Sequence, residues 1–196
     1  MYRRTAVLGL ALLGIGAVSG GRAAGTEAFA PAVGTEIRFA LQDTQGGTVS
    51  SADLRGRWVL VFFGYTSCPD LCPTALLEIA QTLVQLGPLA ARVQPIFVSI
   101  DPQRDTPKIL EEYVSDFDKR ILPLTGNPEQ LDRAAKSFGV EFFKIPGSAP
   151  DAYTFAHSAI ITLLGPEGGL AMRISTDVSA DQMASKLKKL IEVDGF

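Results

Sequence analysis

The chain has 196 residues, with 18 lysines and arginines, 21 acidic residues and a single histidine. A net charge of −3 without a basic cluster argues against a nucleic-acid-binding protein. The length is sufficient for one domain with a sizeable core, so the fold does not need its two cysteines as a structural staple.

The first residues follow the pattern of a membrane anchor or an export signal. Arg3 and Arg4 precede an uncharged, mostly apolar run from Thr5 to Gly21. This run is long for a signal-peptide core and slightly short for a relaxed membrane span. We therefore expect residues 1–24 to be a retained anchor with the arginines on the cytoplasmic side, or alternatively a cleaved signal peptide. Both alternatives place the remaining chain outside the cytoplasm, on the periplasmic face of the inner membrane in a Gram-negative bacterium.

The next segments predict a linker and the first strands of a folded domain. Residues 25–34 are rich in Ala, Gly and Pro, which is typical of a linker, and residues 35–196 then form the domain. Two extended segments, 37–43 and 48–50, flank a Gly-Gly turn and predict an N-terminal β-hairpin. Trp58–Phe63 is apolar without alternation, which predicts a central strand covered on both faces.

The only two cysteines, Cys68 and Cys72, follow this strand directly. They precede an amphipathic segment, 74–86, that predicts a helix with Pro73 at its first position. Because the partial positive charge at a helix N-terminus stabilises a thiolate, we expect the two sulfurs to be close together and reactive. A structural disulfide is the alternative, but its closed loop is so short that it would contribute little stability.

Downstream, segments of strand and helix pattern alternate. The predicted strands are 93–100, 122–125, 141–145, 158–164 and 170–175, and the predicted helices are 107–117, 128–138 and the C-terminal segment. In the polar turn between the first of these strands and helices, Asp101, Arg104 and Asp105 are expected to form an ion pair and a turn rather than a ligand set. Either Asp105 or Thr106 is expected to cap the helix that follows. Residues 146–156 predict an irregular loop. The alternation predicts an α/β fold with a central mixed sheet flanked by helices.

The only histidine, His157, stands at the start of the predicted strand 158–164. Two soft sulfur atoms and one imidazole nitrogen suit Cu(I), and they would also hold zinc if a fourth ligand were present. The spacing alone leaves open whether the fold brings His157 to the cysteines. The alternative is a histidine with a purely structural hydrogen bond.

Four motifs, in this order, resemble the Sco/SenC family of copper chaperones for cytochrome oxidase. They are Phe63–Pro73, Ser99–Pro107, Leu124–Gly126 followed by Glu129 and Gln130, and His157–Ile160 followed by Gly165–Gly168. The resemblance extends over nearly all of the chain that follows the predicted linker, from about residue 35 to residue 193.

The resemblance implies a thioredoxin-like fold that binds copper through Cys68, Cys72 and His157, as Cu(I) or alternatively Cu(II). It implies a membrane-anchored metallochaperone rather than an enzyme. The copper would pass to the Cu(A) site of cytochrome c oxidase subunit II or to another cuproprotein, and another copper donor protein is a further expected partner. Alternatively, the protein would keep the cysteines of the Cu(A) site reduced. The chain departs from the family at Ala156, where an acidic residue usually precedes the histidine, which raises the question of what orients the imidazole. Asp151 is the nearest upstream carboxylate.

Other functions remain open at this point. A thiol–disulfide oxidoreductase would use Cys68 and Cys72 as catalytic thiols and attack a disulfide of an extracytoplasmic partner through a mixed disulfide. A thiol peroxidase and a redox or copper sensor are further alternatives. Copper affinity, reduction potential, peroxide turnover and redox-dependent partner binding distinguish these functions.

Overall fold

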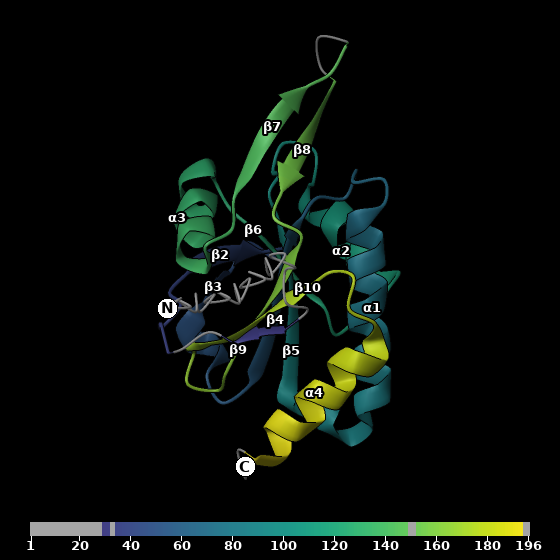
Figure 1. The fold of residues 1–196 in the computed structure, drawn as a ribbon. Coiled ribbons are helices and arrows are strands. Elements are labelled where there is room, and N and C mark those ends of the chain that lie inside the picture. The colour runs from purple at the N-terminus through teal and green to yellow at the C-terminus, as the bar shows by residue number, and fades with distance from the viewer. Residues whose placement is uncertain (1–28, 32–33, 149–151, 194–196) are drawn as a thin grey trace, which may run out of the picture.

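The computed structural model describes residues 29–31, 34–148 and 152–193 (Figure 1). The predicted anchor or signal peptide, residues 1–24, lies outside these ranges. None of the helices within them combines the length and the apolar character that a membrane span requires.

A mixed sheet of eight strands forms the centre of the described part of the chain. In spatial order, its strands are β1 (Phe29–Pro31), β10 (Leu170–Ser175), β9 (Ile160–Leu164), β4 (Trp58–Gly64), β5 (Val93–Ser99), β6 (Leu122–Thr125), β2 (Ala40–Asp43) and β3 (Thr48–Ser50). Strands β4, β5 and β6 are parallel, whereas β9 is antiparallel to β4. The predicted α/β class and the N-terminal hairpin of β2 and β3 are confirmed. Strand β1 pairs with β10, although its residues had the composition of a linker.

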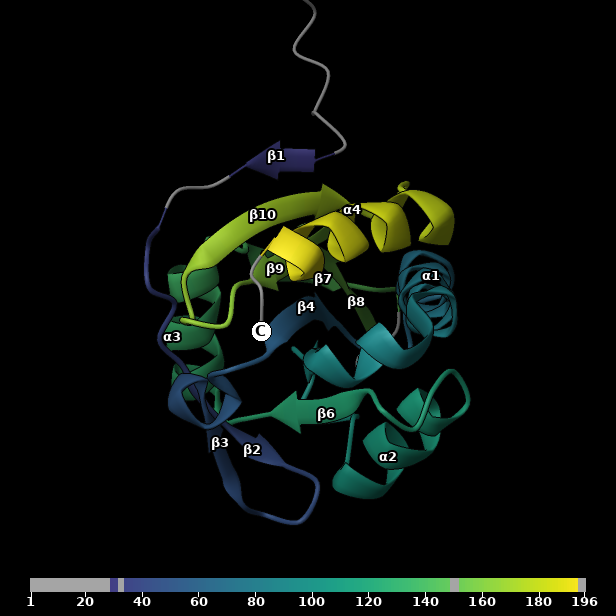
Figure 2. The ribbon, with the colours of Figure 1, turned by 90° about the horizontal axis from the view of Figure 1, so that it is seen from below.

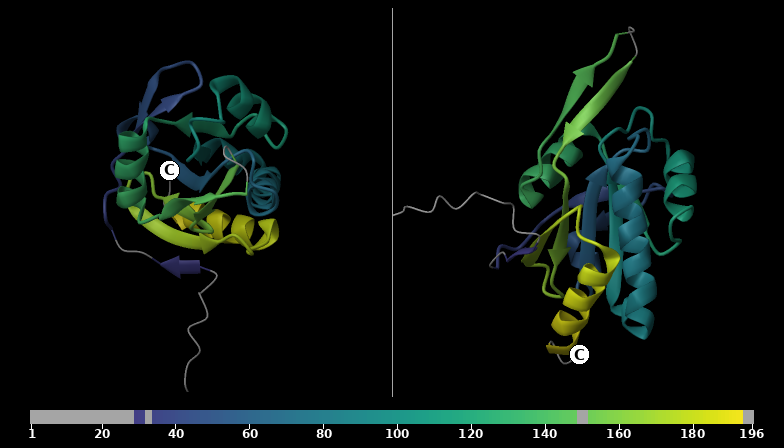
Figure 3. Two further views of the ribbon diagram at one scale, coloured as in Figure 1. Left: turned by 90° about the horizontal axis from the view of Figure 1, so that it is seen from above. Right: turned by 45° about the vertical axis from the view of Figure 1, so that its right-hand side comes forward.

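Helices cover both faces of this sheet. Helices α1 (Leu71–Leu86) and α4 (Ala180–Val193) pack against each other on one side, and α3 (Pro128–Phe138) lies on the opposite side (Figures 2 and 3). Helix α2 (Pro107–Ser115) contacts β6. Two short 3₁₀ helices, η1 (Ser51–Leu54) and η2 (Gly87–Arg92), lead into β4 and β5.

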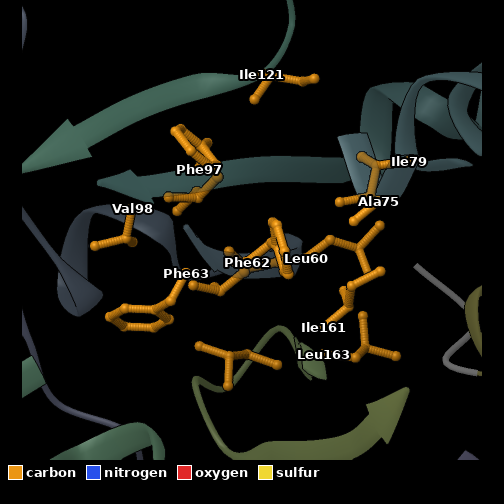
Figure 4. Packing of buried hydrophobic residues seen from close by; sticks show 14 of the residues in the cluster. Leu60, Phe62, Phe63, Ala75, Ile79, Phe97, Val98, Ile121, Ile161 and Leu163 are labelled. Carbon is orange, nitrogen blue, oxygen red and sulfur yellow. The ribbon is translucent and has the colours of Figure 1, made fainter. Parts of the chain in front are cut away.

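Strand β4 lies in the middle of the sheet, and its apolar side chains are buried on both faces. The unbroken apolar run in the sequence predicted this position. Phe62 packs near Phe97 of β5, with ring centroids 6.3 Å apart. Its neighbour Phe63 points to the other face and meets Phe138 of α3, with centroids 5.2 Å apart. Figure 4 shows this core between β4, β5 and α1. The packing fixes the end of β4, from which the cysteine loop departs.

The start of α1 differs from the prediction. The helix begins at Leu71, so Cys72 and Pro73 both lie in its first turn, whereas Pro73 was expected to open it. A proline is tolerated at this place because the N–H groups of the first turn have no partner within the helix. Cys72 is therefore held by regular helix backbone rather than by a loop.

The segment before the histidine also differs from the prediction. Strand β8 (Tyr153–His157) pairs antiparallel with β7 (Phe142–Pro146) in a separate two-stranded sheet, where the sequence predicted an irregular loop. Tyr153, Thr154 and Phe155 have side chains that favour strands, and these preferences decide the structure despite the nearby prolines. His157 thus ends one strand instead of beginning the next. The β7–β8 hairpin projects from the body of the molecule (Figures 1 and 3).

Candidate metal centre

The topology of the sheet brings His157 to the two cysteines. Strand β9 runs antiparallel to β4, with Ile161 opposite Phe62. The residues just before β9 therefore lie beyond the end of β4, where the cysteine loop and the first turn of α1 follow. His157, at the end of β8, occupies this place.

The ligand atoms of Cys68, Cys72 and His157 all lie within 4.8 Å of one another. The Nε2 atom of His157 is 3.5 Å from the sulfur of Cys72. Within the described ranges, this is the one group of three or more His, Cys, Asp or Glu side chains with metal-binding spacing. The structure thus brings together the three residues that were predicted as ligands, and their metal-binding role remains a prediction.

The three ligand atoms lie at the boundary between the core and the surface. The side chain of Cys72 is buried and that of Cys68 is half-buried, and both thiols are free. Gly64, the last residue of β4, has no Cβ, and one placed there would come within 2.7 Å of the Cys72 sulfur. This glycine is a site residue that the sequence analysis missed. Its position at the end of an apolar strand, shortly before two cysteines, was the available signal.

The backbone orients the imidazole of His157. Its Nδ1 atom is 3.2 Å from the carbonyl oxygen of Ser158, and because a carbonyl only accepts, Nδ1 carries the proton in the neutral ring. The lone pair of Nε2 then faces the Cys72 sulfur, as a metal ligand requires. The ring also packs edge-on to Phe62 and Tyr65. The Ser158 carbonyl thus contacts the imidazole directly although position 156 is an alanine, and Asp151 lies outside the described residues.

Burial governs the protonation of the site in the metal-free state. Burial lowers the pKa of the His157 imidazole, and the contact with Ser158 acts in the opposite direction. Burial also raises the pKa of the Cys72 thiol far above its ordinary value. In the metal-free state, burial therefore opposes the thiolate form of Cys72 that a helix N-terminus favours.

The carboxylates near the site are engaged elsewhere or exposed. Asp101 forms the predicted ion pair with Arg104, and of the two predicted caps Thr106 is the one that caps α2. Asp105 is buried and accepts hydrogen bonds from Ser99 and Thr66. None of these carboxylates joins the cysteine–histidine group.

The donor set fits a soft monovalent cation. Two sulfur atoms and one neutral imidazole nitrogen are the ligands that Cu(I) prefers, whereas a structural zinc site needs a fourth ligand. Within the described ranges, no fourth His, Cys, Asp or Glu side chain belongs to the group. On donor chemistry alone, copper fits this site better than zinc does.

A protein-family model described as SCO1/SenC matches residues 27–192 of the chain. Among curated relatives, the mitochondrial protein SCO2 homolog of Bos taurus is 38% identical over 166 residues, which cover 84% of this chain and 62% of the relative. The chain thus spans less than two thirds of that relative's length. A putative copper-binding protein of Stutzerimonas stutzeri is 36% identical over 153 residues, which cover 78% of this chain and 74% of that protein.

The fold is also similar to solved structures. The structure of ScoI from Bradyrhizobium japonicum with copper bound superimposes with a TM-score of 0.73 and 36% sequence identity. The match covers 80% of this chain and 99% of that one. Yeast Sco1 with copper bound has a TM-score of 0.75 and 30% identity, over 82% of this chain and 90% of that one.

Proposed function

The chain belongs to the SCO1/SenC family, and from that premise we propose that it is a copper metallochaperone. Its thioredoxin-like domain holds copper between Cys68, Cys72 and His157. The observation that carries this proposal is the approach of the three ligand atoms to within 4.8 Å of one another. Two relatives with copper in their names or titles add support, because both match most of this chain.

Each ligand has a distinct role in holding the ion. The two sulfurs bind it as thiolates, so copper binding displaces their protons. The buried thiol of Cys72 is fixed by helix backbone, while the half-buried thiol of Cys68 is the more accessible of the two. His157 supplies a neutral nitrogen that its contact with Ser158 has already oriented.

The proposed acceptor is the Cu(A) site of cytochrome c oxidase subunit II, or another cuproprotein with thiolate ligands. A three-ligand site leaves the ion open to attack by acceptor thiolates, so the copper passes by ligand exchange without being released into solution. The basic and apolar pattern of residues 1–24 supports placement on the extracytoplasmic side of a membrane. Transfer is tested by mixing the Cu(I)-loaded chain with the metal-free Cu(A) domain, separating the two proteins and measuring the copper content of each.

Copper binding itself is tested by competition with a chromophoric Cu(I) chelator under reducing conditions. The wild type is expected to bind one equivalent tightly, and His157→Ala to bind at least about tenfold more weakly, which corresponds to ~1.4 kcal/mol. Cys72→Ser should abolish tight binding. Asp70→Asn is the matched control, because Asp70 lies between the thiols in sequence but is exposed and outside the group. Weak binding by the wild type would refute the proposal.

A second candidate function follows from the adjacent free thiols. In a thiol–disulfide oxidoreductase, the half-buried Cys68 would attack a partner disulfide, and Cys72 would then resolve the mixed disulfide. The partner gains two thiols, and Cys68 and Cys72 become a disulfide. A reduction potential in the range of cellular reductants, together with weak copper binding, would favour this function over the chaperone.

A further inference from the structure

The loop between β5 and α2 contacts both segments that carry the proposed ligands. At one end, the buried carboxylate of Asp105 accepts hydrogen bonds from the Thr66 backbone N–H at 3.0 Å and from its hydroxyl at 2.6 Å. Asp105 also accepts from the Ser99 hydroxyl at 2.6 Å. Because Thr66 stands two residues before Cys68, this end of the loop fixes the position of the cysteine segment.

The other end of the same loop holds the hairpin that carries the histidine. The buried carboxylate of Asp101 pairs with Nε of Arg104 and accepts a hydrogen bond from the Tyr153 hydroxyl at 2.8 Å. Arg104 in turn donates from Nη1 to the Tyr153 backbone carbonyl at 3.0 Å. Its guanidinium also lies 3.8 Å from the centroid of the Tyr153 ring. Tyr153 is thus bound through its hydroxyl, its ring and its backbone.

Tyr153 and His157 are the two ends of β8, so the position of one residue constrains the position of the other. The β7–β8 hairpin is a separate two-stranded sheet, and such a unit is marginally stable without further contacts. Closer to the site, Tyr65 adds a second connection. Its hydroxyl is 2.6 Å from the Thr154 hydroxyl and its ring packs against His157.

We propose that Asp101, Arg104 and Tyr153 form a latch that positions His157 over the two thiols. None of the three is in the ligand group, so they act through the histidine as positioning residues. The proposal deepens the proposed function and rests on it where copper affinity is concerned. The latch keeps the third ligand in place before copper arrives, so binding does not have to order the hairpin.

The first experiment needs no metal. The chain contains one histidine, so the imidazole ¹⁵N signals of tag-free protein report on His157 alone. In the wild type we expect the signature of a single neutral tautomer with the proton on Nδ1. Tyr153→Phe and Arg104→Gln should shift these signals toward a mixture of tautomers, and Arg104→Lys should restore them in part because it keeps the charge. Arg120→Gln, which breaks another Arg–Asp ion pair, with Asp118, is the control and should leave the His157 signals unchanged.

The second experiment measures Cu(I) affinity by chelator competition. Tyr153→Phe and Arg104→Gln should each weaken binding by up to about tenfold, in the range of residues that support a metal ligand. In a His157→Ala background the same changes should cause no further loss, because the latch acts only through the histidine. Equal losses in both backgrounds would overturn the proposal, as would unchanged His157 signals in the latch variants.

The two experiments separate failure of the latch from failure of the proposed function. If the wild type binds copper weakly, the metallochaperone proposal fails, while the ¹⁵N signals of the metal-free protein still decide whether the latch positions His157. If copper binds tightly and the latch variants match the wild type in both experiments, the latch is refuted and the function stands.

Discussion

Gly64 ends β4 directly beside the thiol of Cys72, and the space there is too small for a side chain. A Cβ at this position would lie 2.7 Å from the Cys72 sulfur and 2.9 Å from the ring of Phe97. The ring is buried in the core and the sulfur belongs to a helical residue, so neither can move aside at low cost.

Gly64→Ala is therefore expected to displace the Cys72 sulfur. It should lower the free energy of unfolding by ~1–3 kcal/mol, the usual cost of overpacking, and weaken Cu(I) binding. Urea denaturation and chelator competition measure the two effects. Gly165→Ala is the control, because a Cβ there would meet no atom closer than 3.9 Å. If Gly64→Ala and Gly165→Ala have the same free energy of unfolding and the same Cu(I) affinity, this description of the site is contradicted.

A second residue-scale prediction concerns Asp118 and Arg120. Hydrogen bonds from the Arg120 side chain lower the pKa of the Asp118 carboxyl. A depressed carboxyl pKa stabilises the fold above the unfolded-state value of about 4, and this stability is lost as the pH falls through the folded-state value. Arg120→Gln should lower the free energy of unfolding by ~0.5–1 kcal/mol at pH 7, a modest value because Arg120 is partly exposed.

The difference between this variant and the wild type should shrink when urea denaturation is repeated below pH 4. Arg133→Gln breaks a more exposed pair with Glu129 and should have almost no effect at either pH. If the difference in the free energy of unfolding between Arg120→Gln and the wild type does not change with pH, the lost stability is not electrostatic.

The candidate ligands could be predicted from the sequence because they are rare residues with distinctive chemistry. Two cysteines and one histidine left only one set to consider, and the resemblance to a family supplied their common role. The latch residue Tyr153 could not be predicted in the same way. Its contacts with Asp101 and Arg104 depend on the pairing of β7 with β8, which sequence spacing does not reveal.

At the scale of elements, Cys72 and His157 belong to elements that pack against the rest of the fold to different extents. Cys72 belongs to α1, which packs on the sheet and on α4. His157 belongs to a two-stranded hairpin outside the main sheet. Copper bound at the proposed site would therefore connect α1, which is packed in the core, to β8, which lies outside the main sheet.

This difference predicts the pattern of amide hydrogen exchange. In the metal-free protein, the amides of β7 and β8 should exchange faster than those of β4, which is buried on both faces. Cu(I) should slow exchange in β8 more than in β4, since the metal bonds His157 to a residue of α1. Copper-loaded His157→Ala should lack this added protection. Protection of β8 that copper leaves unchanged would mean that His157 does not bind the ion.

The elements that the sequence analysis placed wrongly are those next to the site. The start of α1 was placed at Pro73 because Asp70-Leu71-Cys72-Pro73 has the composition of a turn, whereas the helix already begins at Leu71. Strand β8 was missed because Pro146 and Gly147 interrupt the pattern on which strand prediction depends. Elsewhere the periodicity decided correctly, as in α3, which begins with a capping box at Asn127 and ends at left-handed Gly139.

At the scale of the whole molecule, the alternation of strands and helices predicted the α/β class but not the order of the strands. The insertion of β9 between β4 and β10 is a long-range pairing, decided by which apolar surfaces fit together. This pairing carries His157 to the cysteines, so the proposed site is a product of the global topology.

The whole fold should be stabilised by copper, because the three proposed ligands are together only in the folded state. At a free Cu(I) concentration of 100 times the dissociation constant, mass action adds at most ~2.7 kcal/mol to the free energy of unfolding, and less to the extent that the two cysteines of the unfolded chain also bind the ion. Thermal unfolding with buffered Cu(I) should show a rise in Tm for the wild type and none for Cys68→Ser/Cys72→Ser. An equal rise in both proteins would place the metal elsewhere.

The most direct test of the three-ligand copper site is X-ray absorption spectroscopy of the Cu(I)-loaded protein. The wild type is expected to show two sulfur scatterers and one nitrogen scatterer bound to copper, and His157→Ala should lose the nitrogen and keep both sulfurs. Copper with two sulfur ligands and no nitrogen in the wild type would contradict the role of His157, and copper without sulfur ligands would contradict the site as a whole.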